Sequence, residues 1–154
     1  MDQNLFAAVD HYIEELFVPA DPVLEATLQS IREAGLPQMQ VSPTQGKLLY
    51  LLARLTQARR ILEIGTLAGY SSIWLARSLP ADGRLITLEI NSKHALLAWS
   101  NLSNAGLADK VEVLTGPALE TLPELEARQD EPFDLVFLDA DKPNYTAYLE
   151  AVLR

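Results

Sequence analysis

The chain has 154 residues, which is enough for one domain with a real hydrophobic core. Hydrophobic residues make up 49% of the sequence and cysteine is absent, so the composition excludes intrinsic disorder, disulfide cross-links, thiolate metal sites and thiol nucleophiles. The net charge of −9 argues against nucleic acid or an anionic membrane as a partner, while the carboxylates are candidate oxygen ligands for a hard cation.

The first predicted element is an amphipathic helix at residues 2–17, where Leu5, Val9, Ile13 and Leu16 recur at helical spacing. Acidic residues interrupt this segment, and it has neither the basic start nor the continuous apolar stretch of a secretory signal. No run in the sequence is long and apolar enough to predict a membrane span. We therefore expect a cytoplasmic protein.

Two further helices are predicted before the first strand. Asp21-Pro22 has the form of an N-cap followed by proline at the first helical position. Ser42 has a glutamine three residues later, which is the spacing of a capping box, and the helix that it opens should run to about Ala58. Residues 1–58 are therefore expected to be the N-terminal helices of a single domain that spans residues 1–154.

Strands alternate with helices from residue 59 to residue 154. The predicted strands are 60–64, 85–90, 111–115 and 134–139, and the predicted helices are 70–79, 92–105, 118–127 and 143–153. This alternation is typical of βαβ units that build a parallel sheet. The sequence thus predicts an α/β fold with a βαβ core at residues 59–154.

A glycine-containing turn follows the first predicted strand. Gly65 comes directly after the strand, and Gly69 comes four residues later, where a helical pattern begins. Glycine has no Cβ, so such a turn lets a ligand approach the backbone closely, and the free N–H groups of the helix start favour an anionic group. Glu89 closes the second predicted strand, where an acid can accept hydrogen bonds from ribose hydroxyls. The segment therefore indicates a nucleoside-containing cofactor.

The turn departs from the dinucleotide fingerprint, which has three glycines in the pattern G-x-G-x-x-G. Here the pattern is G-x-x-x-G, and Glu63 stands two residues before the first glycine. An acid at that point repels a pyrophosphate and suits a positively charged ligand. S-adenosylmethionine carries an ammonium and a sulfonium and no phosphate. Two alternatives stay open: an ordinary βα turn with an exposed acid on the second strand, and a less favoured nicotinamide-dependent dehydrogenase.

A second group of polar residues lies at the carboxyl end of the fourth predicted strand, the edge at which open α/β sheets bind ligands. Asp139 is a candidate ligand for Mg²⁺ or another hard cation. Lys142 is a candidate to bind an anionic oxygen, or to act as a base if its pKa were lowered. The alternative is a solvated acidic loop in which Asp141 caps the next helix. His11 and His94 are interpreted as surface residues of helices.

Five motifs together resemble a known family. They lie at residues 38–43, 63–66, 69–71, 88–90 and 138–142. From about Met39 to its last residue, the chain resembles the cation-dependent S-adenosylmethionine O-methyltransferases, which include catechol and caffeoyl-CoA O-methyltransferases. The resemblance implies methyl transfer from S-adenosylmethionine to a phenolic or catecholic hydroxyl of a small molecule, assisted by Mg²⁺ or another divalent cation.

The resemblance also implies a role for individual residues. Those implied to bind the cofactor are Met39, Val41, Glu63, Gly65, Thr66, Gly69, Tyr70, Ser71, Glu89, Pro117, Ala118 and Asp139. Within this set Glu63, Gly65 and Ser71 would surround the methionine part, Met39 and Val41 would close over it, Glu89 would hold the ribose, and Pro117 and Ala118 would border the adenine. The implied catalytic residues are Asp139, as the first metal ligand, and Lys142, near the reacting hydroxyl.

The chain departs from the family at its end. It stops at Arg154, before the family's remaining metal ligands and further strands. The fold expected from the resemblance is therefore a Rossmann-like class I methyltransferase sheet in the order 3-2-1-4, truncated after the fourth strand and its helix. A non-catalytic S-adenosylmethionine-binding or assembly module is the alternative function.

The truncation also suggests a partner. The run at 135–138 would form a bare apolar edge strand, which is a template for pairing with another chain. We therefore expect a homodimer through this edge, either as a symmetric pair or by exchange of the last helix. The less favoured alternative is that the N-terminal helix covers the edge within one chain.

Overall fold

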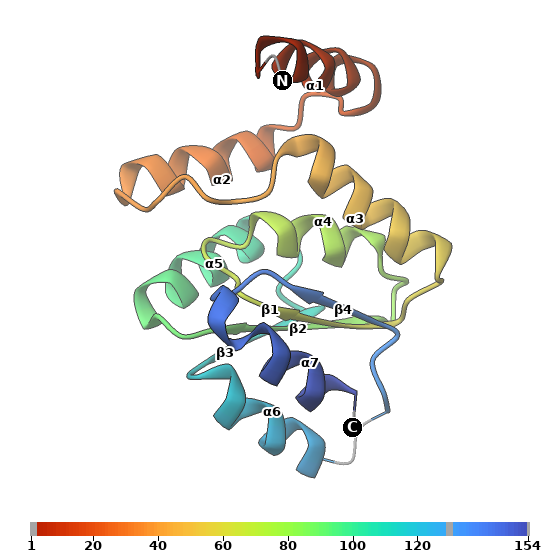
Figure 1. Ribbon diagram of the computed structural model, residues 1–154, viewed down its shortest axis with the longest axis vertical. Coiled ribbons are helices and arrows are strands. Elements are labelled where there is room, and N and C mark those ends of the chain that lie inside the picture. The colour runs from red at the N-terminus through yellow and green to blue at the C-terminus, as the bar shows by residue number, and fades with distance from the viewer. Residues whose placement is uncertain (1–2, 129–130, 154) are drawn as a thin grey trace.

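The computed structural model describes residues 3–128 and 131–153, and these form a four-stranded sheet with helices on both faces (Figure 1). Three helices come first: α1 (Gln3–Phe17), α2 (Pro22–Glu33) and α3 (Pro43–Leu55). Strands and helices then alternate as the sequence predicts. They are β1 (Arg60–Ile64), α4 (Tyr70–Ser78), β2 (Arg84–Glu89), α5 (Ser92–Asn104), β3 (Val111–Thr115), α6 (Ala118–Ala127), β4 (Leu135–Leu138), the 3₁₀ turn η1 (Lys142–Asn144) and α7 (Tyr145–Val152).

Local capping chemistry fixes where the helices begin. The Asp21 carboxylate accepts hydrogen bonds from the backbone N–H groups of Val23 and Leu24, at 3.0 and 3.2 Å, and so opens α2. Ser42 and Gln45 exchange the two hydrogen bonds of a capping box at the start of α3. The helix starts predicted at these positions are confirmed.

The sheet is parallel throughout, and its strand order β3-β2-β1-β4 is the predicted one. Successive residues of a strand face opposite sides of a sheet, so each strand contributes to two cores. Ile61 and Leu85 face the core beneath α3, α4 and α5, whereas Leu62, Ile64 and Ile86 face the core beneath α6 and α7. Helices cover both faces, as expected of parallel strands.

The last strand, β4, pairs with β1 and has no strand on its other side among the described residues. Its four side chains are nevertheless half-buried rather than bare. Leu135 and Phe137 pack on one core, and Val136 and Leu138 pack on the other, because helices lie over both faces. The expectation of a bare apolar edge therefore overstated what β4 exposes: the unpaired part is its backbone edge.

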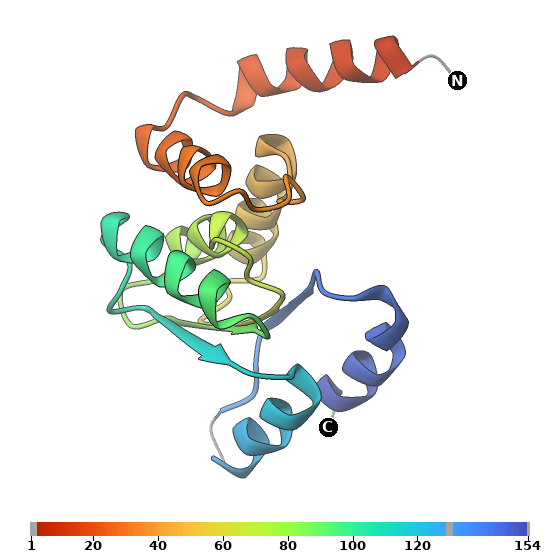
Figure 2. The same cartoon turned by 90° about the vertical axis from the view of Figure 1, so that its left-hand side faces the viewer.

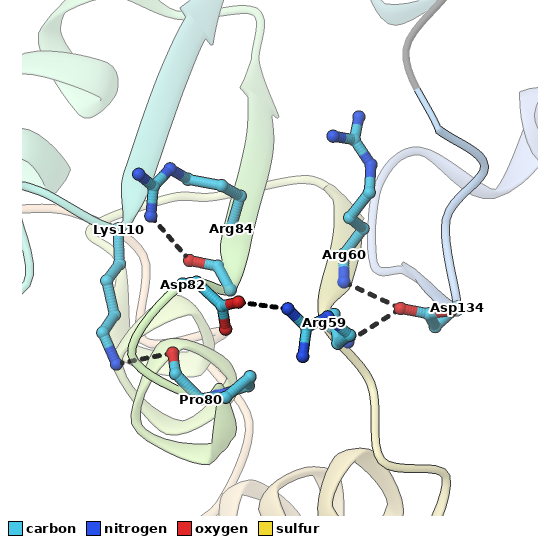
Figure 3. Close-up of polar contacts among 8 residues, drawn as sticks. Arg59, Arg60, Pro80, Asp82, Arg84, Lys110 and Asp134 are labelled. Carbon is cyan, nitrogen blue, oxygen red and sulfur yellow. Dashed lines mark hydrogen bonds and ion pairs between the residues drawn. The ribbon is translucent and has the colours of Figure 1, made fainter.

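At the amino ends of the strands, polar contacts tie neighbouring segments together (Figure 3). One Asp134 carboxylate oxygen accepts hydrogen bonds from the backbone N–H groups of Arg59 and Arg60, at 2.7 and 2.8 Å. These bonds lower the pKa of Asp134. Lys110 donates to the carbonyl of Pro80 at 3.0 Å, and Arg59 pairs with Asp82. These contacts fix the segments at the amino edge of the sheet to one another.

The helix α1 stands apart from the remainder of the structure (Figure 2). It lies on the α3 side of the molecule, on the other face of the sheet from α6 and α7, so it does not cover β4 (Figure 1). None of the helices in the described ranges combines the length and the apolar character needed to cross a membrane.

Candidate functional site

The turn between β1 and α4 forms the floor of the site. Three residues in it adopt positive φ: Gly65 at +100°, Leu67 at +52° and Gly69 at +82°. The N–H of Gly69 donates to the carbonyl of Thr66 at 2.9 Å, which closes the turn before α4 begins. Positive φ costs a residue with a Cβ about 1–2 kcal/mol, which explains the two glycines.

Gly65 also brings two parts of the chain into backbone contact. A Cβ added to Gly65 would lie 2.2 Å from the carbonyl oxygen of Asp139. No side chain separates the turn after β1 from the segment after β4. The expected cofactor-binding turn and the expected acceptor end of the site therefore touch directly.

Replacing Gly65 with alanine is expected to destabilise the fold by about 2 kcal/mol, since the new methyl group meets backbone atoms at a positive φ. Gly69→Ala is the matched control, because it shares a positive φ but its added Cβ would have ordinary contacts at 3.5 Å with Ala98. Urea unfolding of the two variants measures the difference. Equal losses of stability would show that strain at φ, and not the contact with Asp139, is the cause.

Glu63 lies beneath the turn and is fully buried, with 0% of its surface exposed. Its carboxylate accepts hydrogen bonds from the hydroxyls of Ser71, at 2.5 Å, Ser72, and Thr87, at 2.7 Å. Burial raises the pKa of Glu63 to about 7, although the three hydroxyls oppose the rise; the charge of Asp139 adds to it. Glu63 therefore fixes the side chains of Ser71 and Ser72 in the first turn of α4.

Glu89 ends β2 with both carboxylate oxygens engaged by the backbone. One accepts from the N–H of Leu67 at 2.8 Å, and the other from the N–H of Asn91 at 2.9 Å. The Nδ1 atom of His94 lies 3.7 Å from the second oxygen. Each oxygen keeps a free lone pair, so the carboxylate is held in place and can still accept a hydrogen bond from a hydroxyl.

The segment after β4 is held by α7. The Tyr148 hydroxyl donates to one oxygen of Asp141 at 2.5 Å, and the Asn144 amide donates to the other at 2.6 Å. These hydrogen bonds lower the pKa of Asp141, and burial together with the Asp141 contact raises the pKa of Tyr148 to about 12. Asp141 does not cap the helix with its side chain, contrary to the alternative considered from the sequence. It ties the loop that carries Asp139 and Lys142 to α7.

A cavity of about 600 Å³ opens at the carboxyl ends of β1, β2 and β4. This volume is within the usual range of small-molecule sites. The expected residues on its wall are Met39, Gly65, Thr66, Tyr70, Ser71, Glu89, Pro117, Ala118, Asp139 and Lys142. The side chain of Met39 is 69% exposed at this wall. Desolvation raises the pKa of Asp139.

Three residues of the expected cofactor set lie off this wall. Glu63 is behind Ser71, because its carboxylate is satisfied by buried hydroxyls and needs no ligand. Val41 packs on the core beneath α3 and α4, as its apolar side chain favours. Gly69 serves the turn and packs against Ala98 of α5. The roles of these three residues in cofactor binding stay predictions.

Some residues on the wall were not predicted from the sequence. His94 was interpreted as a surface residue, but it is half-buried beside Glu89 and lines the cavity. Gln40, Tyr145 and Tyr148 line it as well. The available signal for His94 was its position in the first turn of the helix that follows Glu89, which faces the same edge of the sheet.

The described residues contain no group of three or more His, Asp or Glu side chains that could hold a metal ion. Asp139 is a carboxylate at the wall that could contribute one ligand, whereas Ca²⁺ or Mg²⁺ takes six or more oxygen ligands from protein, substrate or water. Asp141 is already engaged by Asn144 and Tyr148. The described donor set therefore does not fit a complete divalent-cation site.

The comparisons with known proteins all match O-methyltransferases. A family model described as O-methyltransferase matches residues 11–154. Among curated proteins, a catechol O-methyltransferase of Niastella koreensis is 53% identical over 154 residues, which are 100% of this chain and 70% of that protein. A catechol O-methyltransferase of Mycobacterium tuberculosis is 53% identical over 146 residues, covering 95% of this chain and 65% of that protein.

Solved structures of similar sequence share the fold. An O-methyltransferase from Bacillus cereus in complex with SAH superposes with a TM-score of 0.93 at 53% identity, covering 95% of this chain and 66% of that chain. The O-methyltransferase TomG from Streptomyces achromogenes, in complex with SAM, superposes with a TM-score of 0.94 at 52% identity, covering 99% and 69%. The chain thus spans about two thirds of the length of these relatives.

Proposed function

The chain belongs to the O-methyltransferase family, and from that membership we propose that it binds S-adenosylmethionine as the cofactor part of an enzyme that methylates a phenolic or catecholic hydroxyl. Relatives named catechol O-methyltransferase support the acceptor class, and two similar structures hold SAH or SAM. The observation that carries the proposal is that one cavity has Glu89, at the end of β2, and Asp139 and Lys142, after β4, on its wall.

The order of the strands sets the distance across the cavity between Glu89 and Asp139. Glu89 ends β2, and Asp139 follows β4, with β1 between them. Two strand spacings separate the two ends by roughly 10 Å. In the proposed binding mode Glu89 accepts hydrogen bonds from the ribose hydroxyls, while Pro117 and Ala118 border the adenine. A ribose at Glu89 would leave the reacting methyl group closer to β4.

At the methionine end we assign Gly65, Thr66, Tyr70 and Ser71 to the cofactor, with Met39 closing over it. Glu63 acts through Ser71, whose hydroxyl it orients. The bound cofactor supplies an electrophilic methyl group on a sulfonium. The contribution of the chain is alignment, because holding two reacting groups in the right geometry removes much of the barrier to their reaction.

At the acceptor end we assign Lys142 to the hydroxyl that receives the methyl group. An ammonium next to a phenolic oxygen favours the phenolate, which is the better nucleophile. Asp139 is assigned to the same end, with its pKa raised by desolvation. The described residues do not complete a cation site, so metal assistance would require ligands beyond them, and no step is derived through a metal.

Isothermal titration calorimetry of the purified chain with S-adenosylhomocysteine tests the cofactor assignment. We expect saturable one-to-one binding, because one cavity carries the residues assigned to the ribose, the adenine and the methionine part of the cofactor. NAD is the control ligand, and it should not bind, since the turn after β1 lacks the third glycine of the dinucleotide fingerprint. Binding of NAD without S-adenosylhomocysteine would refute the proposal in favour of a dehydrogenase.

The same chain is expected to show little or no Mg²⁺-stimulated methylation of a catechol, because Asp139 alone is a poor cation site. The measurement is transfer of a labelled methyl group with and without Mg²⁺. Robust stimulated turnover would contradict this expectation. Binding without turnover would favour a cofactor-binding module as the role of this chain on its own.

A further inference from the structure

The buried carboxyl group of Glu63 has an uneven set of hydrogen-bond partners. Its Oε1 atom accepts one hydrogen bond, from the hydroxyl of Ser71 at 2.5 Å. Its Oε2 atom accepts two, from the hydroxyls of Ser72 and Thr87, the latter at 2.7 Å. Of these three hydroxyl-bearing residues, Ser71 is the one that lines the cavity. One oxygen of Glu63 is therefore a single hydrogen bond away from a bound ligand.

The charge of Glu63 determines what Ser71 offers to that ligand, because a hydroxyl has only one proton. While Glu63 is ionised it can only accept, so the proton of Ser71 is committed to Oε1 and Ser71 presents only lone pairs to the cavity. When Glu63 is protonated, one of its oxygens becomes a donor. A hydroxyl that accepts this hydrogen bond has its own proton free to donate elsewhere.

Two routes lead from a proton on Glu63 to the cavity. On the Oε1 side the proton is donated to Ser71, and the proton of Ser71 turns toward the cavity. On the Oε2 side it is donated to Thr87, which then donates to Thr66, 2.5 Å away and also on the cavity wall. The first route reverses one hydrogen bond and leaves Oε2 accepting from both Ser72 and Thr87, whereas the second reverses two. Ser71 is therefore the hydroxyl that the proton frees.

The backbone around Ser71 favours an anionic ligand group. Ser71 is the second residue of α4, and Gly69, the residue before this helix, makes no side-chain hydrogen bond to the free N–H groups of the first turn. Such N–H groups favour an anion. An ionised Glu63 buried beneath the same turn would repel the anion, whereas a protonated Glu63 would not. The α-carboxylate of S-adenosylmethionine is an anionic group of this kind.

The surroundings of Glu63 stabilise its protonated form near neutral pH. Burial raises the pKa of Glu63 to about 7 against the opposing effect of the three hydroxyls, which face it from α4 and β2. On the other side, its neighbour in β4 is the apolar Phe137. Two carboxylates lie close by on the cavity wall, Glu89 at the end of β2 and Asp139 after β4, and the charge of Asp139 raises the pKa of Glu63 further.

We propose that Glu63 is a positioning residue that holds a proton while the carboxylate of the cofactor is bound, and that this proton turns the hydroxyl of Ser71 from an acceptor into a donor toward that carboxylate. The proposal rests on the proposed binding of S-adenosylmethionine. The proton comes from solvent and resides on Oε1, Oε1–H donates to the Oγ atom of Ser71, and Oγ–H donates to the ligand. Binding is thereby coupled to the uptake of one proton, so the affinity falls as the pH rises.

Titration calorimetry with S-adenosylhomocysteine, which carries the same carboxylate, gives the first test. Titrations at one pH in two buffers that differ in their enthalpy of ionisation count the protons exchanged on binding. We expect net uptake of a proton above pH 7, and an affinity that is about 10-fold weaker at pH 8 than at pH 6. Release of a proton, or an affinity that rises with pH, would overturn the proposal in favour of an ionised Glu63 with Ser71 accepting from the ammonium of the ligand.

Glu63→Gln separates the proton from a structural role. Its amide reproduces the protonated carboxyl group, because the NH₂ group can donate to Ser71 while the carbonyl oxygen accepts from Ser72 and Thr87. We expect this variant to bind S-adenosylhomocysteine about 10-fold more tightly than the wild type at pH 8 and equally at pH 6. Titration of the ligand and of other groups on the wall affects both proteins alike. Weaker binding by Glu63→Gln at both pH values would contradict the proposal.

Ser71→Ala and Ser72→Ala form a matched pair, because each removes one hydroxyl from Glu63 but only Ser71 lines the cavity. Ser71→Ala should bind more weakly at pH 6 and lose the pH dependence of binding. Ser72→Ala should keep that dependence with its midpoint at a higher pH, since the hydrogen bond from Ser72 lowers the pKa of Glu63. A pH dependence that survives in Ser71→Ala and disappears in Thr66→Val would overturn the assignment to Ser71.

The experiment also distinguishes this proposal from the proposed function on which it rests. Wild-type chain that binds S-adenosylhomocysteine with no proton uptake and the same affinity at pH 6 and pH 8 refutes the role of Glu63 and leaves the proposed function standing. Wild-type chain that does not bind S-adenosylhomocysteine at either pH refutes both.

Discussion

Replacing Glu63 with glutamine is expected to remove a pH dependence from the free energy of unfolding. The pKa of Glu63 rises from 4.5 to about 7 in the folded state, chiefly because burial removes the carboxyl group from water. Between these pH values the unfolded chain releases a proton that the folded chain keeps. The free energy of unfolding therefore falls as the pH rises through this window, by an amount on the order of 3 kcal/mol.

Glutamine keeps the size of the side chain and cannot ionise, so the variant lacks this fall. Urea unfolding at a series of pH values from 4 to 8 measures the free energy of unfolding of both proteins. The stability of the wild type relative to Glu63→Gln should be greatest at the acidic end of the series. Glu120→Gln on the exposed surface of α6 is the matched control and should track the wild type. Parallel curves for wild type and Glu63→Gln would show that the pKa of Glu63 is the same in the folded and the unfolded chain, and would contradict the prediction.

Replacing Glu89 with alanine is expected to weaken the binding of S-adenosylhomocysteine by roughly 10- to 150-fold, which is the effect of losing a hydrogen bond of 1.5–3 kcal/mol to a charged group. The carboxylate is held by the N–H groups of Leu67 and Asn91 and retains lone pairs for the ribose. Titration calorimetry measures the change in affinity.

Glu89→Gln is the informative companion, because it keeps one acceptor oxygen and should bind with an affinity between those of the wild type and Glu89→Ala. Circular dichroism separates loss of the ribose contact from collapse of the turn that Leu67 anchors. An unchanged affinity in Glu89→Ala would remove the ribose assignment, while leaving the remainder of the cavity as a candidate site.

Local chemistry made most of the fold predictable from the sequence. The caps at Asp21 and Ser42 depend on residues within one turn of the helix start, so their signal is complete in a short window. The strands alternate with helices in an unbroken series, and that alternation determines a parallel sheet. The strand order followed from the resemblance to a family and is confirmed.

The site was predictable only where a residue's role follows from its place at a strand end. Gly65, Glu89 and Asp139 belong to this class and line one cavity. The complete burial of Glu63 was not predictable, because its hydrogen-bond partners Ser72 and Thr87 lie on α4 and on β2, whereas Glu63 lies on β1. His94 was missed because a lone histidine on a helix carries no signal until Glu89 is placed beside it. The exposure of the apolar side of α1 was likewise not predictable, since periodicity identifies an apolar side but not what that side faces.

The contact between Gly65 and Asp139 has a consequence for how such an enzyme could change its acceptor. Backbone atoms set the separation between the turn after β1 and the segment after β4, so no change of rotamer can widen or narrow it. Substitutions around Asn144 and Tyr145 would reshape the acceptor end while this spacing stays constant. Substitutions could thus change which acceptor fits the cavity without changing the distance between the turn after β1 and the segment after β4. Gly65 would keep that distance constant.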